Sequence, residues 1–316
     1  MNVRSIHRSP VMLARHAMAT RFELVLHGDI EREPALRAAG EEALDEIDHL
    51  EAQLSLYLPT SEIAQVNARA ARVPVRVSPR VFALLEQARQ LSRETAGAFD
   101  ITIAPLVRCW GFMNGIGRMP AAHEIEAARA SVGMHLVELN PSDSTVRFVR
   151  EGVMLDLGAI GKGFAIEQAI RLLREAGVAS ALLHGGTSTV YALGHPPEAE
   201  AWNVAIHDPD PYCNQPLQKV SLRDEALSVS AVWGRSFQSE GKTLGHVLDP
   251  RTGHPASNAI LSAVILESAT ETDALSTALL VGGAESQAAI ARLRPAARTL
   301  LVQETKGERT TLERAS

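Results

Sequence analysis

An aspartate and a threonine stand four residues apart in the sequence Thr272-Asp273-Ala274-Leu275-Ser276-Thr277. The surrounding apolar residues predict a helix, on which Asp273 and Thr277 share one face. Carboxylate and hydroxyl oxygens placed in this way can bind a hard cation such as Mg²⁺, with water or a phosphate completing the shell. Polar side chains that cap a helix start give the same pattern. Taken alone, the pair leaves both explanations open.

A glycine-rich segment, Leu155-Asp156-Leu157-Gly158-Ala159-Ile160-Gly161-Lys162-Gly163, could bind phosphate. We expect a strand to end at Asp156 and a helix to begin near Gly163. Free N–H groups at a helix start attract anions, glycines allow close backbone approach, and Lys162 adds a cation. The segment matches neither of the common nucleotide-binding glycine motifs. A tight strand-to-helix turn with a surface lysine remains the alternative.

Two more segments carry groups that could take part in chemistry. His246 precedes an Asp-Pro-Arg-Thr-Gly turn, and histidine is the usual general base near neutral pH. A structural histidine would also fit there. Phe99 and Asp100 follow Gly97 at the end of a predicted helix. They could hold a ring system, or they could form a hydrophobic plug with a capping aspartate.

The elements that must position these groups follow from periodicity and turn residues. Alternation predicts a strand over 21–27, and apolar three- and four-residue steps predict a long helix from Leu36 to Leu54. Ser78-Pro79 opens a second helix, which Gly97 closes. The remaining expected elements are a hairpin over 145–155 turning at 151–152, a helix over 163–176, short strands over 180–266, helices over 271–281 and 284–293, and a strand over 299–302.

Length and composition restrict the class of protein. The 316 residues are 46% hydrophobic and carry a net charge of −6, which is ordinary for a globular chain and provides no basic face for nucleic acid. Helices and strands mix without strict alternation, so we expect an α+β fold with mixed sheets and flanking helices. No apolar stretch is long enough for a membrane span, and we see no signal peptide or lipoprotein cysteine. We therefore expect a cytoplasmic protein.

The four segments, taken in their order along the chain, resemble the FAD:protein FMN transferase family, also called the ApbE family. The resemblance runs from Met18 to about Gly283. Each block is weak alone, and the ordered set is specific. The set comprises Met18-Ala19-Thr20, Ser55-Leu56-Tyr57, Ser61-Glu62, Asn67, GAFDITIAPLVRCWGF, LDLGAIGKGF, His184-Gly185-Gly186, GHVLDPRTG and TDALSTALLVGG.

The resemblance implies Mg²⁺-dependent transfer of FMN from FAD to a threonine or serine hydroxyl of an acceptor protein, with release of AMP. It implies two lobes around a central flavin-binding cleft, within one transferase domain over 18–303. An N-terminal segment, 1–17, precedes this domain, and the polar residues over 304–316 predict a frayed tail. The resemblance implies Asp273, Thr277 and the backbone carbonyl of Ala159 as metal ligands, and His246 as the base. It implies flavin contacts at Met18, Tyr57, Ala98, Phe99, Asp100, Asp156, Lys162 and Leu248.

The chain departs from the family pattern at three places. Ala19 replaces a glycine, Thr187 replaces the aspartate of Gly-Gly-Asp, and Ser230-Ala231-Val232-Trp233 replaces a Ser-Gly-Asp-Tyr-like stretch. These changes leave the acceptor and the finer flavin contacts open. Two alternatives also stay open: a Mg²⁺-dependent FAD pyrophosphatase that gives FMN and AMP, and a non-catalytic FAD-binding protein.

Overall fold

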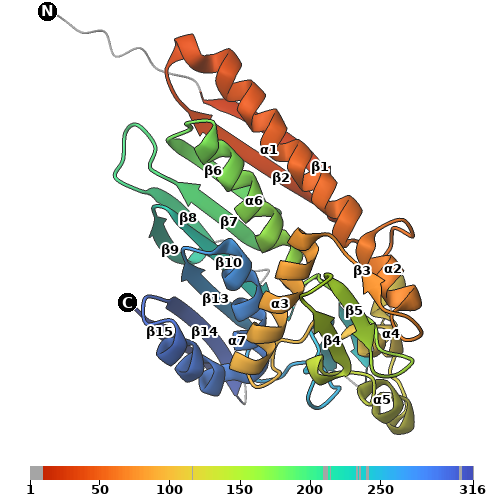
Figure 1. Ribbon diagram of the computed structural model, residues 1–316. Coiled ribbons are helices and arrows are strands. Elements are labelled where there is room, and N and C mark those ends of the chain that lie inside the picture. Colours follow the sequence, from red (N-terminus) through yellow and green to blue (C-terminus); the bar gives the residue numbers. More distant parts are fainter. Residues whose placement is uncertain are drawn as a thin grey trace, which may run out of the picture.

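The computed structural model describes residues 10–115, 117–208, 213, 215–232, 234, 236–239, 242–305 and 308–315. Its largest element is an eight-stranded sheet in which all neighbouring strands are antiparallel (Figure 1). In spatial order the strands are β1 (Val11–Ala17), β2 (Thr20–His27), β6 (Ser180–Gly185), β7 (Thr189–Leu193), β10 (Glu225–Ala231), β13 (Leu261–Leu266), β14 (Arg298–Thr305) and β15 (Glu308–Arg314).

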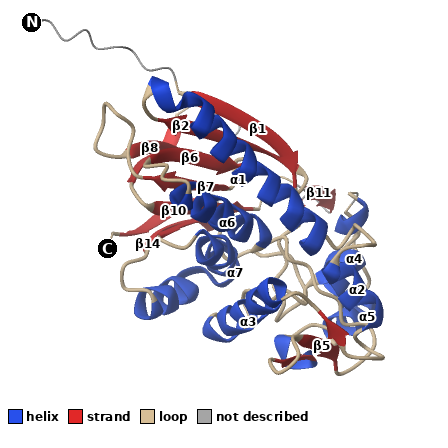
Figure 2. Cartoon of the chain, turned by 45° about the horizontal axis from the view of Figure 1, so that its top comes forward, coloured by secondary structure: helices blue, strands red, loops and turns tan. Residues whose placement is uncertain are grey.

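Three long helices cover one face of this sheet (Figure 2): α1 (Glu33–Leu54), α6 (Gly161–Glu175) and α7 (Ala269–Leu293). The hairpin of β8 (Trp202–His207) and β9 (Pro216–Leu222) packs on the other face through a second apolar cluster. Both faces are therefore covered over the middle of the sheet, and all five residues of β7 are buried. Central strands buried on both faces read as continuous apolar runs rather than alternating ones.

Most of the remaining elements gather beside the sheet: α2 (Glu62–Arg69), α3 (Pro79–Glu94), α4 (Ala104–Cys109), α5 (Ala122–Arg129), β3 (Val75–Arg76), β4 (Val137–Asn140), β5 (Thr145–Phe148), β11 (Ser236–Ser239), β12 (Lys242–Gly245) and the short helices η2 (Phe112–Asn114) and η3 (Met134–Leu136). The short helix η1 (Ile30–Arg32) instead leads directly into α1. Part of this group has its own apolar cluster around Trp110, Phe112 and Leu248, while α3 and β5 contribute to the main core. The α+β class expected from the sequence is confirmed.

The expected hairpin over 145–155 is wrong. Strand β5 pairs backward with β4 and with β3, and residues 153–157 form no strand. The reason is hydrogen bonding to a side chain that is distant in the sequence. The Asn67 amide bonds both the N–H and the C=O of Leu155, at 2.7 and 2.9 Å. Backbone groups satisfied by a side chain need no neighbouring strand.

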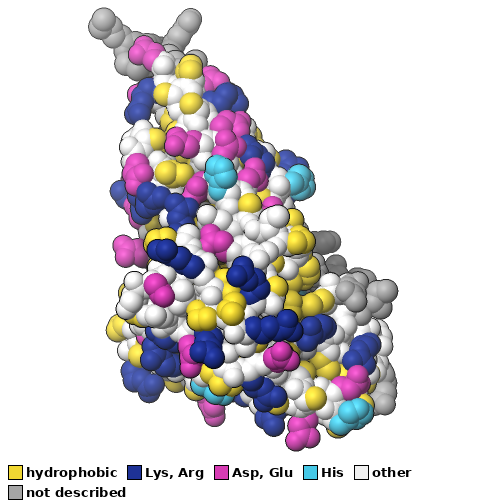
Figure 3. Space-filling model, turned by 45° about the vertical axis from the view of Figure 1, so that its right-hand side comes forward, with side chains coloured by type: hydrophobic (Ala, Val, Ile, Leu, Met, Phe, Trp, Pro, Cys, Tyr) yellow, Lys and Arg dark blue, Asp and Glu magenta, His cyan; other side chains and the backbone are white. Residues whose placement is uncertain are grey.

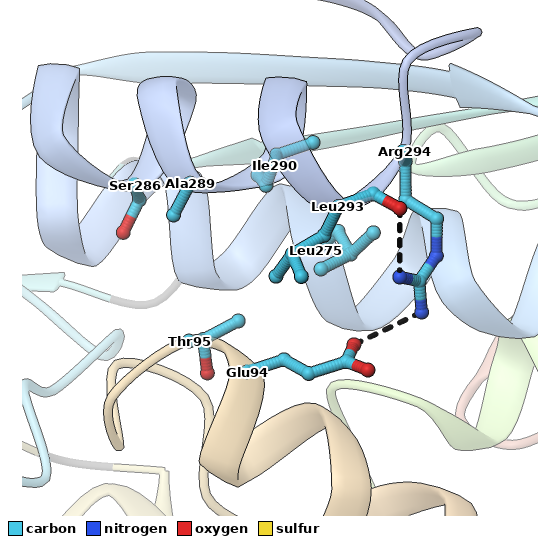
Figure 4. A pocket seen from close by; sticks show the side chains of 8 residues that line it. All are labelled: Glu94, Thr95, Leu275, Ser286, Ala289, Ile290, Leu293 and Arg294. Atoms are coloured by element: carbon cyan, nitrogen blue, oxygen red, sulfur yellow. Dashed lines mark hydrogen bonds and ion pairs between the residues drawn. The ribbon is translucent and has the colours of Figure 1, made fainter.

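Helix α7 reverses its direction at Gly283. This residue has φ 60° and ψ −140°, a conformation that is essentially confined to glycine. The two halves correspond to the two helices expected over 271–281 and 284–293. Arg294 at the end of the second half reaches Glu271 at the start of the first, with N–O distances of 2.7 and 2.9 Å. It also bonds Glu94 of α3 beside an apolar cavity of about 10 Å³ (Figure 4).

The C-terminal residues differ from the frayed tail expected over 304–316. Residues Glu308–Arg314 form β15, which pairs along its whole length with β14. The polar residues of β15 are mostly exposed, as edge strands commonly are. Within the described residues, no helix is both long enough and apolar enough to cross a membrane. Acidic and basic side chains are interspersed on the face shown in Figure 3.

Candidate metal and phosphate site

Asp273 lies in the first turns of α7 and faces the start of α6. Its residue surface is only 5% exposed, and its Oδ2 accepts a hydrogen bond of 3.0 Å from the Gly163 N–H. A β-carbon on Gly163 would lie 2.1 Å from the Ala269 carbonyl oxygen and 2.7 Å from the Asp273 β-carbon. Glycine at this position is therefore what lets the two helices come close enough for the contact.

The glycine-rich turn brings a cation to the same place. The Lys162 ammonium lies 3.9 Å from Asp273 Oδ1 and donates to the Gly158 carbonyl at 3.2 Å. Asp156 shapes the turn, since its Oδ1 accepts the Gly158 N–H at 2.8 Å. The Asp156 N–H donates to the Ile101 carbonyl at 2.7 Å, which ties the turn to the segment holding Asp100. A helix start with a lysine next to it favours an anionic ligand.

The donors around Asp273 suit a hard cation. Thr277 lies one turn further along α7, where its hydroxyl donates to the Asp273 carbonyl at 3.4 Å and contacts Ser230 Oγ at 3.3 Å. Ala159 lies in the turn that leads into α6. Among the described residues, no three His, Cys, Asp or Glu side chains gather as a metal-binding group. Oxygen donors of mixed type are what Mg²⁺ takes when a substrate phosphate completes its shell.

Asp273 also keeps capacity to bind a cation. A carboxylate offers about four lone-pair positions. The Gly163 N–H uses one on Oδ2, and the Thr189 hydroxyl, at 3.4 Å, uses one on Oδ1. One position on each oxygen is left by these two hydrogen bonds. The chemistry of the residues present therefore fits the predicted metal.

Sequence reasoning missed the polar side chains behind this carboxylate. Thr189 on β7, Ser228 on β10 and Thr272 on α7 are each 2% exposed or less, and we call them the hydroxyl chain. No short sequence segment marks them, because the three residues come from separate elements that meet only in the folded chain. Gly163 was also undervalued, since its role depends on α7, more than a hundred residues further along the chain.

Two further predicted flavin contacts lie in the connections that follow β1 and α1. Met18 and Ala19 form the β1–β2 turn with φ values of 50° and 57°, a strained conformation for residues other than glycine. The turn packs on the Gly185-Gly186 loop, where a β-carbon on Gly186 would lie 2.3 Å from the Thr20 hydroxyl oxygen. Tyr57 follows α1 and is 60% exposed. An exposed aromatic ring of this kind suits stacking on a flat ligand.

The predicted contacts Ala98, Phe99 and Asp100 are buried, at 1%, 1% and 8% exposure. The Asp100 carboxylate accepts four hydrogen bonds: from the Thr102 N–H and hydroxyl, the Ser92 hydroxyl and the Met134 N–H. Its side chain therefore holds three segments together. An open depression of about 360 Å³ lies on its outer side; its lining includes Gly97, Asp100, His135, Pro250 and Arg251.

His246 and Leu248 are positioned by the elements beside the sheet. His246 follows β12 and meets the Phe112 ring edge-to-face, with 6.4 Å between ring centroids. Leu248 is 4% exposed within the Trp110–Phe112 cluster and forms an isolated β-bridge with Pro255. Of the departing residues, Thr187 is exposed and Ser230 contacts Thr277, while Trp233 lies outside the described residues. The base role of His246 stays a prediction.

An antiparallel sheet under three helices, with the buried Asp273 carboxylate facing a lysine-bearing helix start, defines an α+β protein. The chain belongs to the ApbE family, whose model matches residues 18–301. This agrees with the family resemblance found in the sequence.

Relatives and solved structures match along most of the chain. The FAD:protein FMN transferase of Treponema pallidum is 31% identical over 281 residues, covering 84% of this chain and 77% of the relative. That of Klebsiella pneumoniae is 31% identical and covers 90% and 82%. The ApbE protein of Thermotoga maritima has a TM-score of 0.84 at 26% identity, covering 96% of both chains. The apo flavinyl transferase ApbE of Pseudomonas stutzeri has a TM-score of 0.81 at 27% identity, covering 99% and 96%.

Proposed function

We propose that this protein transfers FMN from FAD to a serine or threonine hydroxyl of an acceptor protein, with Mg²⁺ as cofactor and AMP as the leaving product. The observation that carries the proposal is Asp273, buried against the α6 start and Lys162, with Thr277 one turn away. Relatives named for this activity match most of the chain.

Asp273, Thr277 and the Ala159 carbonyl would hold the metal. When bound, Mg²⁺ would offset the negative charge of the FAD pyrophosphate as the phosphorus is attacked. Lys162 and the positive end of the α6 dipole would attract the phosphate oxygens and orient them. Tyr57 would stack on the flavin ring, and Asp156 would keep the glycine-rich turn in its phosphate-facing shape.

The transfer step is a phosphoryl substitution at the FMN-side phosphorus. The acceptor hydroxyl oxygen forms a bond to that phosphorus, and the bond from phosphorus to the bridging oxygen breaks, so that AMP departs. A hydroxyl is a weak nucleophile until a positioned base removes its proton. His246 would accept that proton, with its ring held edge-to-face by Phe112.

One assay tests the proposal against its alternatives. Purified protein is incubated with FAD and Mg²⁺, with and without a threonine-containing acceptor, and AMP and acceptor-bound flavin are measured. Acceptor-dependent flavin attachment with matching AMP is expected. AMP without attachment would favour the pyrophosphatase, and no AMP under either condition would favour a non-catalytic FAD-binding protein.

Substitution of His246 tests the base assignment. His246→Asn should keep FAD affinity and melting temperature while flavin transfer falls about a hundredfold to ten-thousandfold, the range for removal of a general base. Wild-type transfer in a stable variant would remove His246 from the mechanism. A joint loss of stability and FAD affinity would instead mark it as structural. The cytoplasmic location stays a prediction.

A further inference from the structure

The hydroxyl chain of Thr189, Ser228 and Thr272 forms a buried hydrogen-bond circuit with Asp273, and this circuit links α7 to the middle of the sheet. Thr189 on β7 donates its hydroxyl to Asp273 Oδ1 at 3.4 Å. Ser228, the cross-strand partner of Thr189 on β10, lies 3.3 Å from the Thr189 oxygen and 3.0 Å from the Thr272 oxygen. Thr272 precedes Asp273 in the chain, so the circuit returns to the same helical turn.

Proton counting gives the circuit a direction. Each hydroxyl carries one proton, and a carboxylate can only accept. The Thr272 hydroxyl donates to the Ala269 carbonyl at 2.9 Å, so its oxygen accepts from Ser228. The single Ser228 proton is shared between the Thr272 and Thr189 oxygens, so the Thr189 oxygen accepts from Ser228 and its own proton is left for Asp273.

We propose that Thr189 is a positioning residue for the metal-binding carboxylate, and that Ser228 and Thr272 keep its hydroxyl pointed at Asp273. The Gly163 N–H fixes Oδ2 and the Thr189 hydroxyl fixes Oδ1, so the carboxylate is held at both oxygens in one orientation. Outer partners of this kind set the direction of a metal ligand, and their loss commonly weakens metal binding. The inference rests on the metal site of the proposed function.

The burial of the circuit strengthens this assignment. Thr189 and Thr272 are 2% and 0% exposed, and Ser228 is 0% exposed, so water cannot replace a lost partner without entering the core. Buried hydroxyls without partners are costly, and a circuit in which each oxygen is paired resists rearrangement. A rigid carboxylate suits a small cation with strict geometry such as Mg²⁺.

The test measures the metal directly. Mn²⁺ is titrated into the purified full-length protein and the free ion is followed by electron paramagnetic resonance. Thr189→Val, which keeps the shape but removes the hydroxyl, should weaken Mn²⁺ binding about 10- to 100-fold. Thr189→Ser should restore affinity to within about threefold, a loss below the range for a missing outer partner. Ser228→Ala should fall between the two.

Ser262→Ala is the matched control. Ser262 is equally buried on β13, but its hydroxyl donates to the Ser276 carbonyl at 2.7 Å rather than to the circuit. It should lower the melting temperature while Mn²⁺ affinity stays at the wild-type value. The Mg²⁺ concentration that gives half-maximal AMP release should be higher in the variants that bind Mn²⁺ more weakly. At saturating Mg²⁺, the rate of AMP release should differ less between the variants.

The outcomes separate this inference from the proposed function. Wild-type Mn²⁺ affinity in a folded Thr189→Val protein would overturn the positioning role; if that variant does not fold, wild-type affinity in Ser228→Ala would do so. Absence of Mn²⁺ binding by the wild type would overturn the metal site and the positioning role together. If the wild type and its variants bind Mn²⁺ in the expected order of affinity but the wild type releases no AMP, the positioning role is supported and the proposed transferase activity is overturned.

Discussion

Asp100 and Asp273 are buried to nearly the same degree, at 8% and 5% exposure, yet their carboxylates accept different numbers of hydrogen bonds from the chain. Asp100 accepts four hydrogen bonds from the chain, two on each oxygen, which fill its lone-pair positions. Asp273 accepts two, one on each oxygen, and has Lys162 at 3.9 Å. The first carboxylate is saturated by the fold, and the second keeps capacity for a ligand.

The comparison teaches that burial of a carboxylate does not by itself mark a binding site. A buried charge must be paired or hydrogen-bonded, and a structural carboxylate meets that need within the protein. A ligand-binding carboxylate is instead oriented by few donors and completed by the ligand. Counting accepted hydrogen bonds therefore separates two aspartates that the sequence analysis both assigned to the site, Asp273 as a metal ligand and Asp100 as a flavin contact.

The largest expected effect is on catalysis at Asp273. Asp273→Asn should lower Mg²⁺-dependent release of AMP from FAD by more than about 100-fold, beyond the range for outer partners, because it removes the charged ligand. The melting temperature should change little, since an amide oxygen can still accept the Gly163 N–H. Wild-type AMP release by the folded variant would make the two aspartates equivalent and break the comparison.

The next effect is on stability at Asp100. In Asp100→Asn an NH₂ group replaces one carboxylate oxygen and cannot accept hydrogen bonds. It would face two buried donors, either the Thr102 N–H and hydroxyl or the Ser92 hydroxyl and the Met134 N–H. The loss should be about 2–4 kcal/mol, from unsatisfied donors and a lost charge-assisted interaction. Differential scanning calorimetry should show a melting temperature several degrees lower, while AMP release per folded molecule stays within about tenfold of wild type. A stable variant with abolished AMP release would give Asp100 a direct role.

The smallest effect sharpens the account of Asp100. Ser92→Ala removes one of its four donors and should cost about 1 kcal/mol, the net value of a single hydrogen bond. The variant should melt slightly below wild type and release AMP at the wild-type rate. A loss as large as that of Asp100→Asn would mean that Ser92, rather than the full set of donors, carries the interaction.

Much of the architecture could be predicted from local sequence signals. The strand over 21–27, the long helix ending at Leu54 and the Ser78 cap each follow from periodicity or capping, and the structure confirms them. The expected hairpin over 145–155 failed because Asn67, nearly ninety residues away, satisfies the Leu155 backbone. The strand β15 was missed because a polar edge strand lacks an apolar period.

The candidate site divides in the same way. Asp273, Thr277 and Lys162 could be named from short segments, and the fold brings Lys162 beside Asp273. The saturation of Asp100 could not be foreseen, because its partners Ser92 and Met134 come from separate segments. The hydroxyl chain was invisible for the same reason, since it forms only where β7, β10 and α7 meet.

The close crossing of α6 and α7 at Gly163 has a consequence for how related sequences can vary. Any side chain there would strike the Ala269 carbonyl oxygen and the Asp273 β-carbon. Neither atom belongs to the Asp273 carboxylate, so position 163 is restricted to glycine whatever side chain stands at position 273. In an alignment of relatives, glycine should therefore hold position 163 even in lineages that have lost the aspartate, as long as the two helices cross this closely.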